Sequence, residues 1–270
     1  MSEWYKKKVK GVLLDITGVL KDSGPGGGFA IDGSIEAVKR LKASGLMVRF
    51  CTNETTITRK TLVKDLTNFG FDVSESEMFS PIPAMCSILT SCGLRPHLLV
   101  SPACLPDFSA VETSNPNCVV LGDSESVFSY ENLNKAFQVL MSLDKPVLFS
   151  LGKGKYYRSG GELVLDVGPY MKALEYACDV TAEVVGKPEK SFFQSAVQDM
   201  GIKPEECVMI GDDIMGDVGG AQGAGLRGVQ VRTGKYRPQD EQHPTIQADG
   251  RTNNLAEAVD LILAHIQLGQ

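Results

Sequence analysis

The chain has 270 residues, of which 43% are hydrophobic and 22% charged, so it can bury a substantial core in one or two domains. Its formal net charge of -6 argues against a protein that coats nucleic acid, because such binding relies on many Lys and Arg contacts to phosphate. We therefore expect no nucleic-acid partner, and an anionic substrate must be attracted by a local group of cations.

The cysteines and the hydropathy pattern favour a cytoplasmic location. The seven cysteines are an odd number, are scattered and form no CxxC pair, which is typical of reduced thiols in the cytosol. No run of the sequence approaches the ~20 apolar residues that a membrane-spanning helix needs. The basic N-terminus leads into a strand-like segment without a cleavage site. The sequence therefore predicts a cytoplasmic protein with no membrane partner.

Short apolar runs alternate with helical patterns in the first part of the chain. The run Lys10 to Leu14 ends at Asp15 and predicts a buried parallel strand that stops at a carboxylate. A helical pattern follows at 34–44, and a second apolar run at 46–51 stops at Thr52-Asn53. Strand, helix and strand at this spacing form a βαβ unit, so we expect a parallel sheet with right-handed crossovers.

The middle of the chain, residues 94–183, has an α/β pattern of its own. Its expected strands and helices lie at 97–100, 118–121, 132–141, 147–151 and 170–177. After this block, strands at 207–210 and 228–231 and a helix at about 254–267 return to the first sheet. The predicted fold class is therefore α/β. A Rossmann-like parallel-sheet core is made of residues 1–93 and 184–270, and 94–183 form an inserted α/β cap domain.

Polar residues directly after strand-like runs are candidates for a site, because ligands of open parallel sheets lie beyond the carboxyl ends of the strands. The candidate segments are Asp15-Ile16-Thr17-Gly18, Thr52-Asn53, Gly186-Lys187-Pro188 and Gly211 to Asp217. Taken singly, Thr52 is more simply a helix start and Lys187 a surface lysine. Asp212, Asp213 and Asp217 are harder to explain, since three carboxylates within six residues repel one another unless a cation joins them.

Together these segments resemble the haloacid dehalogenase (HAD) superfamily. Its phosphatases carry, in this order, an Asp ending the first strand, a Thr or Ser ending the second, a Lys, and a pair of acidic residues. This sequence has all four motifs in the same order. The resemblance implies a HAD-like core with an inserted cap of the C2 type. It also implies a magnesium-dependent phosphatase that forms an aspartyl-phosphate intermediate.

The resemblance further implies a role for each motif residue. Asp15 and Lys187 are the catalytic residues, and Mg²⁺ is held by Asp15, the backbone carbonyl of Thr17, and Asp212. Asp213 and Asp217 support the metal waters or Lys187. The substrate is bound by Asp15, Ile16, Thr17, Thr52, Asn53 and Lys187. These residue types suit the chemistry, because an attacking carboxylate and a phosphate dianion repel each other unless nearby cations neutralise the charge.

Thr17 departs from the common pattern, in which a second Asp two residues after the nucleophile protonates the leaving group. A hydroxyl is not a proton donor near neutral pH as a tuned carboxylic acid is. We expect this change to favour P–O–P and P–N bonds, whose leaving groups are stable anions or nitrogens that take a proton from solvent. Two alternatives stay open: a general phosphomonoester phosphatase, and a catalytically weak protein that binds phosphorylated ligands.

Longer segments extend the resemblance over nearly the whole chain, cap included. They are LLDITGVL (13–20), VRFCTNE (48–54), TSNPNCVV (113–120), LDVGPYMKALEYAC (165–178), AEVVGKP (182–188), GDDIMGDVGGAQ (211–222) and ADGRTNNLAEAVDL (248–261). They are similar to one branch of the superfamily. This similarity implies activity on phosphohistidine, phospholysine, imidodiphosphate and inorganic pyrophosphate, with phosphohistidine or phospholysine proteins as further partners. It also implies a homodimer in the cytoplasm and the nucleus.

The stretch Gly152 to Arg158 in the predicted cap combines glycines with three cations and two aromatic residues. It is either a loop that contacts the substrate or a basic hairpin turn. Both interpretations bring positive charge to the cap.

Overall fold

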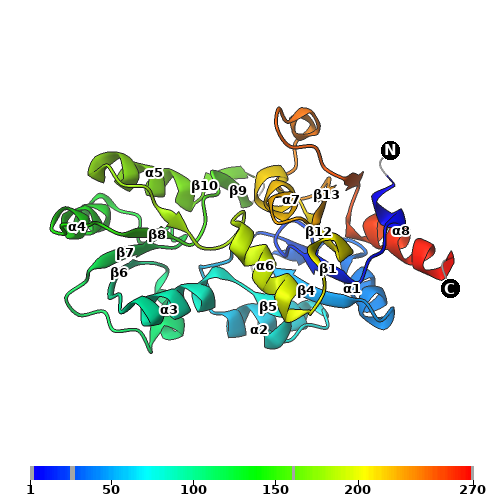
Figure 1. Cartoon of the computed structure of the whole chain (residues 1–270), viewed down its shortest axis with the longest axis horizontal. Helices are drawn as coiled ribbons and strands as arrows, with labels where there is room; N and C mark the ends of the chain where they lie inside the picture. The colour runs from blue at the N-terminus through cyan, green and yellow to red at the C-terminus, as the bar shows by residue number, and fades with distance from the viewer. Residues whose placement is uncertain (1–2, 25–27, 160–161, 269–270) are drawn as a thin grey trace.

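The protein divides into two lobes, each built around a parallel β-sheet (Figure 1). The structure is a computed structural model in which residues 3–24, 28–159 and 162–268 are described. The larger lobe holds a six-stranded sheet in the order β14-β13-β12-β1-β4-β5, and its neighbouring strands are all parallel. The strands are β1 (Gly11–Leu14), β4 (Met47–Cys51), β5 (Met78–Phe79), β12 (Cys207–Gly211), β13 (Arg227–Val231) and β14 (Gly250–Thr252).

Helices cover both faces of this sheet, which is why its two central strands, β1 and β12, are apolar throughout. In β1, Val12 and Leu14 pack in one hydrophobic cluster with α1, α2 and α8, whereas Leu13 packs in another with Phe193 of α6. Successive side chains of a strand point to opposite faces, so every residue of β1 is buried. The helices of this lobe are α1 (Ser34–Ala43), α2 (Arg59–Phe69), α6 (Lys190–Asp199), α7 (Gly220–Gly223) and α8 (Leu255–Leu268).

The smaller lobe is a four-stranded parallel sheet in the order β11-β8-β7-β6, also covered on both faces. Val120 packs in one cluster with α3, and its neighbour Val119 packs in another with α4 and α5. The elements are α3 (Pro81–Cys92), β6 (Pro96–Leu99), β7 (Cys118–Leu121), α4 (Tyr130–Met141), β8 (Leu148–Ser150), α5 (Val167–Cys178) and β11 (Glu183–Val184). Among the helices that the structure describes, none has the length and apolarity to cross a bilayer.

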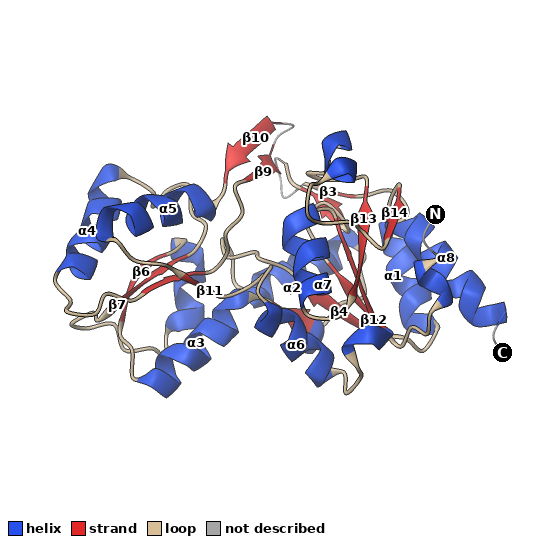
Figure 2. Ribbon diagram, turned by 45° about the horizontal axis from the view of Figure 1, so that its top comes forward, coloured by secondary structure: helices blue, strands red, loops and turns tan. Residues whose placement is uncertain are grey.

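Two antiparallel strand pairs lie outside these sheets. β2 (Lys21–Asp22) pairs with β3 (Phe29–Ala30), and β9 (Tyr156–Ser159) pairs with β10 (Glu162–Leu165). Figure 2 shows β9 and β10 between the lobes, at the top of the view. The sequence analysis placed none of these four strands, although a basic hairpin turn was one of its two interpretations of residues 152–158. β2 and β3 have only two residues each, and β10 keeps an exposed apolar face instead of forming a buried apolar run.

The predicted fold class, a Rossmann-like parallel-sheet core with an inserted α/β cap, is confirmed by the two sheets. The division after residues 93 and 183 stays a prediction. The packing of α3 with the smaller sheet favours an earlier first boundary, near Pro81. The two chain segments that connect the lobes lie next to each other there, one at Pro81 and the other at Gly186. A Cβ atom added to Gly186 would lie 2.8 Å from the Cγ atom of Pro81.

Candidate active site

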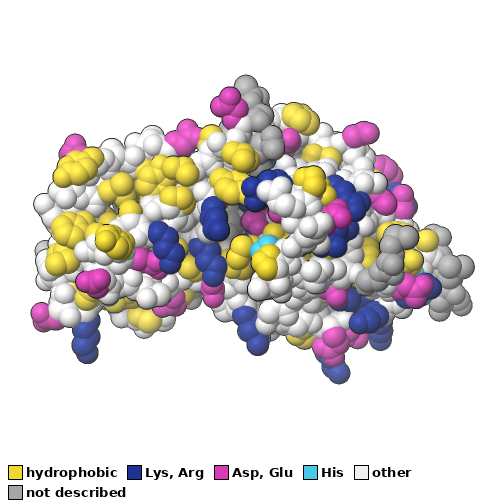
Figure 3. Space-filling model, turned by 90° about the horizontal axis from the view of Figure 1, so that it is seen from above, with side chains coloured by type: hydrophobic (Ala, Val, Ile, Leu, Met, Phe, Trp, Pro, Cys, Tyr) yellow, Lys and Arg dark blue, Asp and Glu magenta, His cyan; other side chains and the backbone are white. Residues whose placement is uncertain are grey.

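A cavity of about 1150 Å³ is lined by residues of both lobes. On the core side it lies beyond β1, β4 and β12, because the C-terminal ends of these adjacent parallel strands meet at one edge of the sheet. Figure 3 shows Lys and Arg side chains around a hollow in this face, with Asp and Glu side chains inside it. The predicted site residues that line the cavity are Asp15, Thr17, Thr52, Asn53, Lys187, Asp212, Asp213 and Asp217.

Lys187 links two carboxylates at the floor of the cavity. Its Nζ atom donates to Oδ1 of Asp15 at 2.6 Å and to Oδ1 of Asp217 at 2.6 Å, and all three side chains are buried. Burial alone would lower the pKa of Lys187, but the charges of Asp15 and Asp217 outweigh it and raise the pKa above its usual value. Lys187 is therefore charged near neutral pH.

Asn53 holds the backbone of Lys187. Its Nδ2 atom donates to the carbonyl of Lys187 at 2.8 Å, and its Oδ1 atom accepts from the Lys187 N–H at 2.8 Å. The neighbouring Thr52 is buried, and its Oγ1 atom accepts from the N–H of Glu54 at 3.0 Å. The side chain of Asn53 thus positions the lysine. That Thr52 and Asn53 also bind phosphoryl oxygens stays a prediction.

The turn after Asp15 passes very close to the acidic motif. The Ile16 side chain is buried in the hydrophobic core, so a substrate contact there would have to use its backbone. Gly18 has φ +94°, and a Cβ atom added to it would lie 2.2 Å from Oδ2 of Asp212. Only glycine fits this backbone conformation and this approach. Thr17, half-buried between these residues, faces the cavity.

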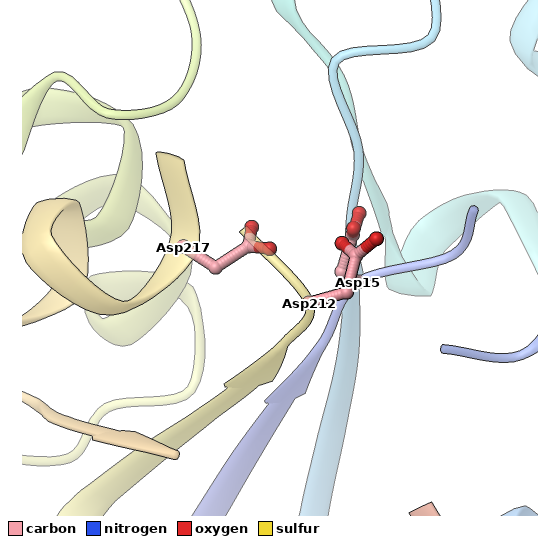
Figure 4. Close-up of side chains that lie close together, drawn as sticks. All are labelled: Asp15, Asp212 and Asp217. Carbon is pink, nitrogen blue, oxygen red and sulfur yellow. The ribbon is translucent and has the colours of Figure 1, made fainter. Parts of the chain in front are cut away.

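The carboxylates of Asp15, Asp212 and Asp217 form a compact cluster, with ligand atoms within 4.8 Å of one another. Figure 4 shows Asp15 and Asp212 side by side at the ends of neighbouring strands, with Asp217 turned toward them. Burial, with the charges of Asp15 and Asp217, raises the pKa of Asp212 well above its usual value, although Lys235 opposes this shift. Burial and the charge of Asp15 likewise raise the pKa of Asp217, to about 7.

The hydrogen bonds in this cluster leave one carboxylate oxygen atom without a partner. Asp217 uses Oδ1 on Lys187 and Oδ2 on the N–H of Asp213, at 3.1 Å. Asp212 accepts from the N–H of Lys235 at 2.7 Å through Oδ2, but its buried Oδ1 atom has no hydrogen-bond partner. An unpaired buried carboxylate oxygen beside a second carboxylate suits a hard divalent cation. The residues present therefore fit a magnesium ion.

Sequence reasoning missed Lys235, which follows β13. Its Nζ atom lies 3.3 Å from Oδ2 of Asp213, whose Oδ1 atom accepts from the N–H groups of Met215 and Gly216 at 2.9 Å. Burial would raise the pKa of Asp213, but Lys235 and these N–H groups outweigh it and lower that pKa. The rule applied to the other strands, that polar residues follow the strand end, would have found Lys235 as well.

The cap contributes carboxylates as well as lysines to the lining of the cavity. Asp123 follows β7 and donates its N–H to Oγ1 of Thr55 at 3.0 Å, and Asp166 begins α5; both line the cavity. Within the stretch of open interpretation, residues 153–157 line the cavity, and β9 of the hairpin begins at Tyr156. The guanidinium of Arg237 lies 5.0 Å from the Tyr156 ring centroid, which ties this hairpin to the core lobe.

Asp123→Asn should stabilise the protein more at pH 8 than at pH 5. Burial, with the charges of Asp166, Glu54 and Glu125, raises the pKa of Asp123 from its usual 3.8 to about 7. A carboxyl group with a raised pKa in the folded state favours folding below its unfolded pKa, and this contribution is lost as pH rises to about 7. Asn, which does not ionise, avoids that loss.

We expect the melting temperature gained by this substitution to be about 2–4 °C larger at pH 8 than at pH 5, measured by circular dichroism. Asp144→Asn, at an exposed position, is the control. An equal gain at both pH values would contradict the predicted shift.

The fold defines a HAD-like hydrolase, together with the arrangement of Asp15 and Lys187 beside the acidic residues Asp212, Asp213 and Asp217. A family model described as haloacid dehalogenase-like hydrolase matches residues 12–125, and a second, described as HAD-hydrolase-like, matches residues 184–258. The chain belongs to this family.

Three relatives resemble nearly the whole chain. It is 62% identical over 267 residues to the phospholysine phosphohistidine inorganic pyrophosphate phosphatase of Bos taurus, covering 98% of this chain and 99% of that protein. For the Homo sapiens protein of the same name the identity is 61%, with the same coverage. Haloacid dehalogenase-like hydrolase domain-containing protein 2 of Homo sapiens is 43% identical, covering 96% of this chain and 98% of that one. The predicted family and the predicted enzyme class, a phosphatase, are thus confirmed.

Among solved structures, a 4-nitrophenylphosphatase from Thermotoga maritima superposes with a TM-score of 0.83 at 24% identity, covering 97% of this chain and 100% of that one. A glycerol phosphate phosphatase from Mycobacterium tuberculosis, in complex with magnesium, has a TM-score of 0.78 at 18% identity, with coverage of 94% and 77%. At these identities, the similarities show the shared fold.

Proposed function

We propose that this protein is a magnesium-dependent phosphatase that hydrolyses P–N and P–O–P bonds through an aspartyl-phosphate on Asp15. The observation that carries the proposal is the buried ion-pair cluster, in which Lys187 holds Asp15 beside the unpaired Oδ1 atom of Asp212. The substrates follow from the names of the relatives, which act on phospholysine, phosphohistidine and inorganic pyrophosphate. Imidodiphosphate is a further candidate, because its bridging bonds are P–N bonds within a diphosphate framework.

Asp15 would attack phosphorus and form an acyl phosphate, which water then hydrolyses, so that one slow reaction is divided into two faster ones. Lys187 fixes the attacking carboxylate through its 2.6 Å hydrogen bond and offsets negative charge as it spreads over the phosphoryl oxygens. Asp217 and Asn53 keep this lysine in place, one through its ammonium group and the other through its backbone.

Asp15, Asp212 and the carbonyl of Thr17 would hold the magnesium ion. When bound, the ion neutralises charge on the phosphoryl oxygens, so that an anionic nucleophile can approach an anionic substrate. Asp217 is less suited as a direct ligand because both of its oxygens already accept hydrogen bonds from the protein. Asp213 supports the turn that carries Asp217, through N–H groups at its start.

Thr17 supports the choice of bond type. It faces the cavity two residues after Asp15, where a carboxylic acid would protonate an alkoxide leaving group. Without that acid, phosphate leaving groups and nitrogens that take a proton from solvent have the advantage over alkyl alcohols. Thr17→Asp should therefore improve hydrolysis of alkyl esters relative to P–N and P–O–P substrates.

A substrate panel tests the proposal. We expect the wild-type protein with Mg²⁺ to hydrolyse imidodiphosphate, pyrophosphate and phospholysine at least about 10-fold faster than glycerol phosphate, and Thr17→Asp to narrow this ratio about 10-fold. Chelation by EDTA should abolish all turnover. Equal rates on glycerol phosphate and imidodiphosphate would favour a general phosphomonoester phosphatase. Binding of all substrates without turnover would favour a phospho-ligand binding protein.

On the resemblance alone, we further propose a homodimer that is located in the cytoplasm and the nucleus, with phosphohistidine or phospholysine proteins as additional substrates. Sedimentation equilibrium tests the oligomeric state, and a constant mass of one chain at micromolar concentration would contradict the dimer. Fractionation of cells that express the protein tests its location.

A further inference from the structure

Lys235 has a backbone fixed directly on the predicted metal site. Its N–H donates to Oδ2 of Asp212 at 2.7 Å, and the hydroxyl of the nearby Thr233 donates to the carbonyl of Gly18. Gly234, between them, has φ +59°, and a Cβ atom there would lie 2.1 Å from Oδ2 of Asp212. The segment that carries Lys235 is therefore held at a defined position beside the nucleophile loop.

The side chain of Lys235 reaches from this position into the cavity and remains partly accessible. Its side chain is 23% exposed, against 5% for Lys187, and both lysines line the cavity. Lys187 is bound to two carboxylates at 2.6 Å, whereas Lys235 makes a longer 3.3 Å contact with Asp213. Because Oδ1 of Asp213 also accepts from two N–H groups, this carboxylate keeps two hydrogen bonds when Lys235 turns from Oδ2 to a ligand.

The charge of Lys235 acts on both sides of the cavity. Burial would lower its pKa, but the carboxylates of Asp213, Asp212, Asp217 and Asp15 outweigh burial and raise it. On the cap side, its charge in turn acts on Asp166. The side chain of Lys235 thus lies near carboxylates of both the core and the cap.

The carboxylates of the cap, Asp123 and Asp166, would repel one class of leaving group. When Asp15 attacks a diphosphate, the bond from phosphorus to the bridging oxygen breaks, and the electron pair leaves with that oxygen as inorganic phosphate. A distal phosphate bound toward the cap would therefore gain one negative charge close to Asp123 and Asp166, which line the cavity. When the substrate is a phosphorylated amine, the pair leaves with nitrogen, which takes a proton from solvent, and the product carries no new negative charge.

We propose that Lys235 selects diphosphate substrates by binding the distal, leaving phosphate. This inference rests on the proposed function and assigns one of its two substrate classes to one residue. Other cavity lysines are less suited. Lys153 and Lys172 form ion pairs with Glu189 and Glu175, Lys21 lies over the Phe69 ring, and Lys155 is exposed just before the cap hairpin. Only the loop after β13 brings a lysine backbone into direct hydrogen bonding with the described acidic cluster.

The test compares kcat/KM for two substrate classes in wild type, Lys235→Met and Lys235→Arg, all with saturating Mg²⁺. We expect Lys235→Met to lose about 10- to 100-fold on pyrophosphate, the range for a charge-assisted hydrogen bond, but less than about 3-fold on phospholysine. Lys235→Arg should restore most of the diphosphate activity. Inhibition by inorganic phosphate should weaken in Lys235→Met in parallel. Lys64→Met, on the exposed face of α2, controls for loss of one positive charge.

An equal loss on both substrate classes would overturn the inference, because it would show that Lys235 acts only through the acidic cluster. Unchanged selectivity, or selective loss in Lys155→Met instead, would overturn it as well. If Lys235→Met does not fold, Lys235→Gln replaces it, with the same expected ratio. A wild-type protein without turnover on any of these substrates would refute the proposed function itself. An active wild type with unaltered selectivity in the variants refutes only the role of Lys235.

Discussion

Asp15→Asn is expected to lower turnover of every phosphorylated substrate by about 10⁴-fold or more, the scale on which removal of a nucleophile acts in other covalent enzymes. The amide is similar in size and still meets Lys187, but it cannot form the acyl phosphate. The measurement is turnover of imidodiphosphate with Mg²⁺, combined with an acid quench that traps labelled phosphate on the wild-type chain.

The matched control is Asp179→Asn, at an exposed position with φ +53°, a backbone conformation that asparagine also adopts readily. It should retain wild-type turnover. Residual activity of Asp15→Asn within 100-fold of wild type, or trapped label on that variant, would refute the aspartyl-phosphate mechanism.

Lys187→Met should lower both stability and activity. Removal of the ammonium group leaves Asp15 and Asp217 buried without their shared cation, and breaking a buried ion pair from one side costs about 3–5 kcal/mol of unfolding free energy. Turnover should fall about 10³-fold, because charge on the phosphoryl oxygens loses a preorganised donor. Urea unfolding, followed by circular dichroism, measures the first effect, and hydrolysis of imidodiphosphate measures the second.

A double variant separates the two effects. Lys187→Met with Asp217→Asn removes one of the stranded carboxylates, so it should recover part of the lost stability but none of the lost activity. Recovery of activity in the double variant would show that Lys187 only compensates charge. A fully stable single variant would show that the buried pair contributes little.

The central strands and the acidic cluster could be predicted from the sequence because both depend on local patterns. β1 and β12 are buried throughout, so they form continuous apolar runs, and parallel strands bring their C-terminal ends to one edge. The position of Asp15 and Asp212, side by side at that edge, follows directly from this rule.

Other features depend on contacts that no local pattern encodes. β5 and β14 contain two and three residues, too few to show a period. The packing of α3 with the smaller sheet depends on tertiary contacts within that lobe, and the approach of Asp123 to Thr55 depends on how the two lobes meet. The hydrogen bond from the Asn53 side chain to the backbone of Lys187, 134 residues away, could not be predicted either, since it depends on tertiary structure.

The hydrogen bonds between Asn53 and Lys187 have a consequence for how the molecule can vary. They close a loop of the chain that contains the entire smaller lobe. The two segments that connect the lobes, at Pro81 and Gly186, lie next to each other beside these hydrogen bonds. The hydrogen bonds between Asn53 and Lys187 lie on the core side of both connecting segments. A rotation of the cap about these segments would therefore leave the ammonium group of Lys187 in place. Segments within the loop can therefore lengthen, shorten or be exchanged, and access for larger or smaller molecules can change, while the reacting groups keep their spacing.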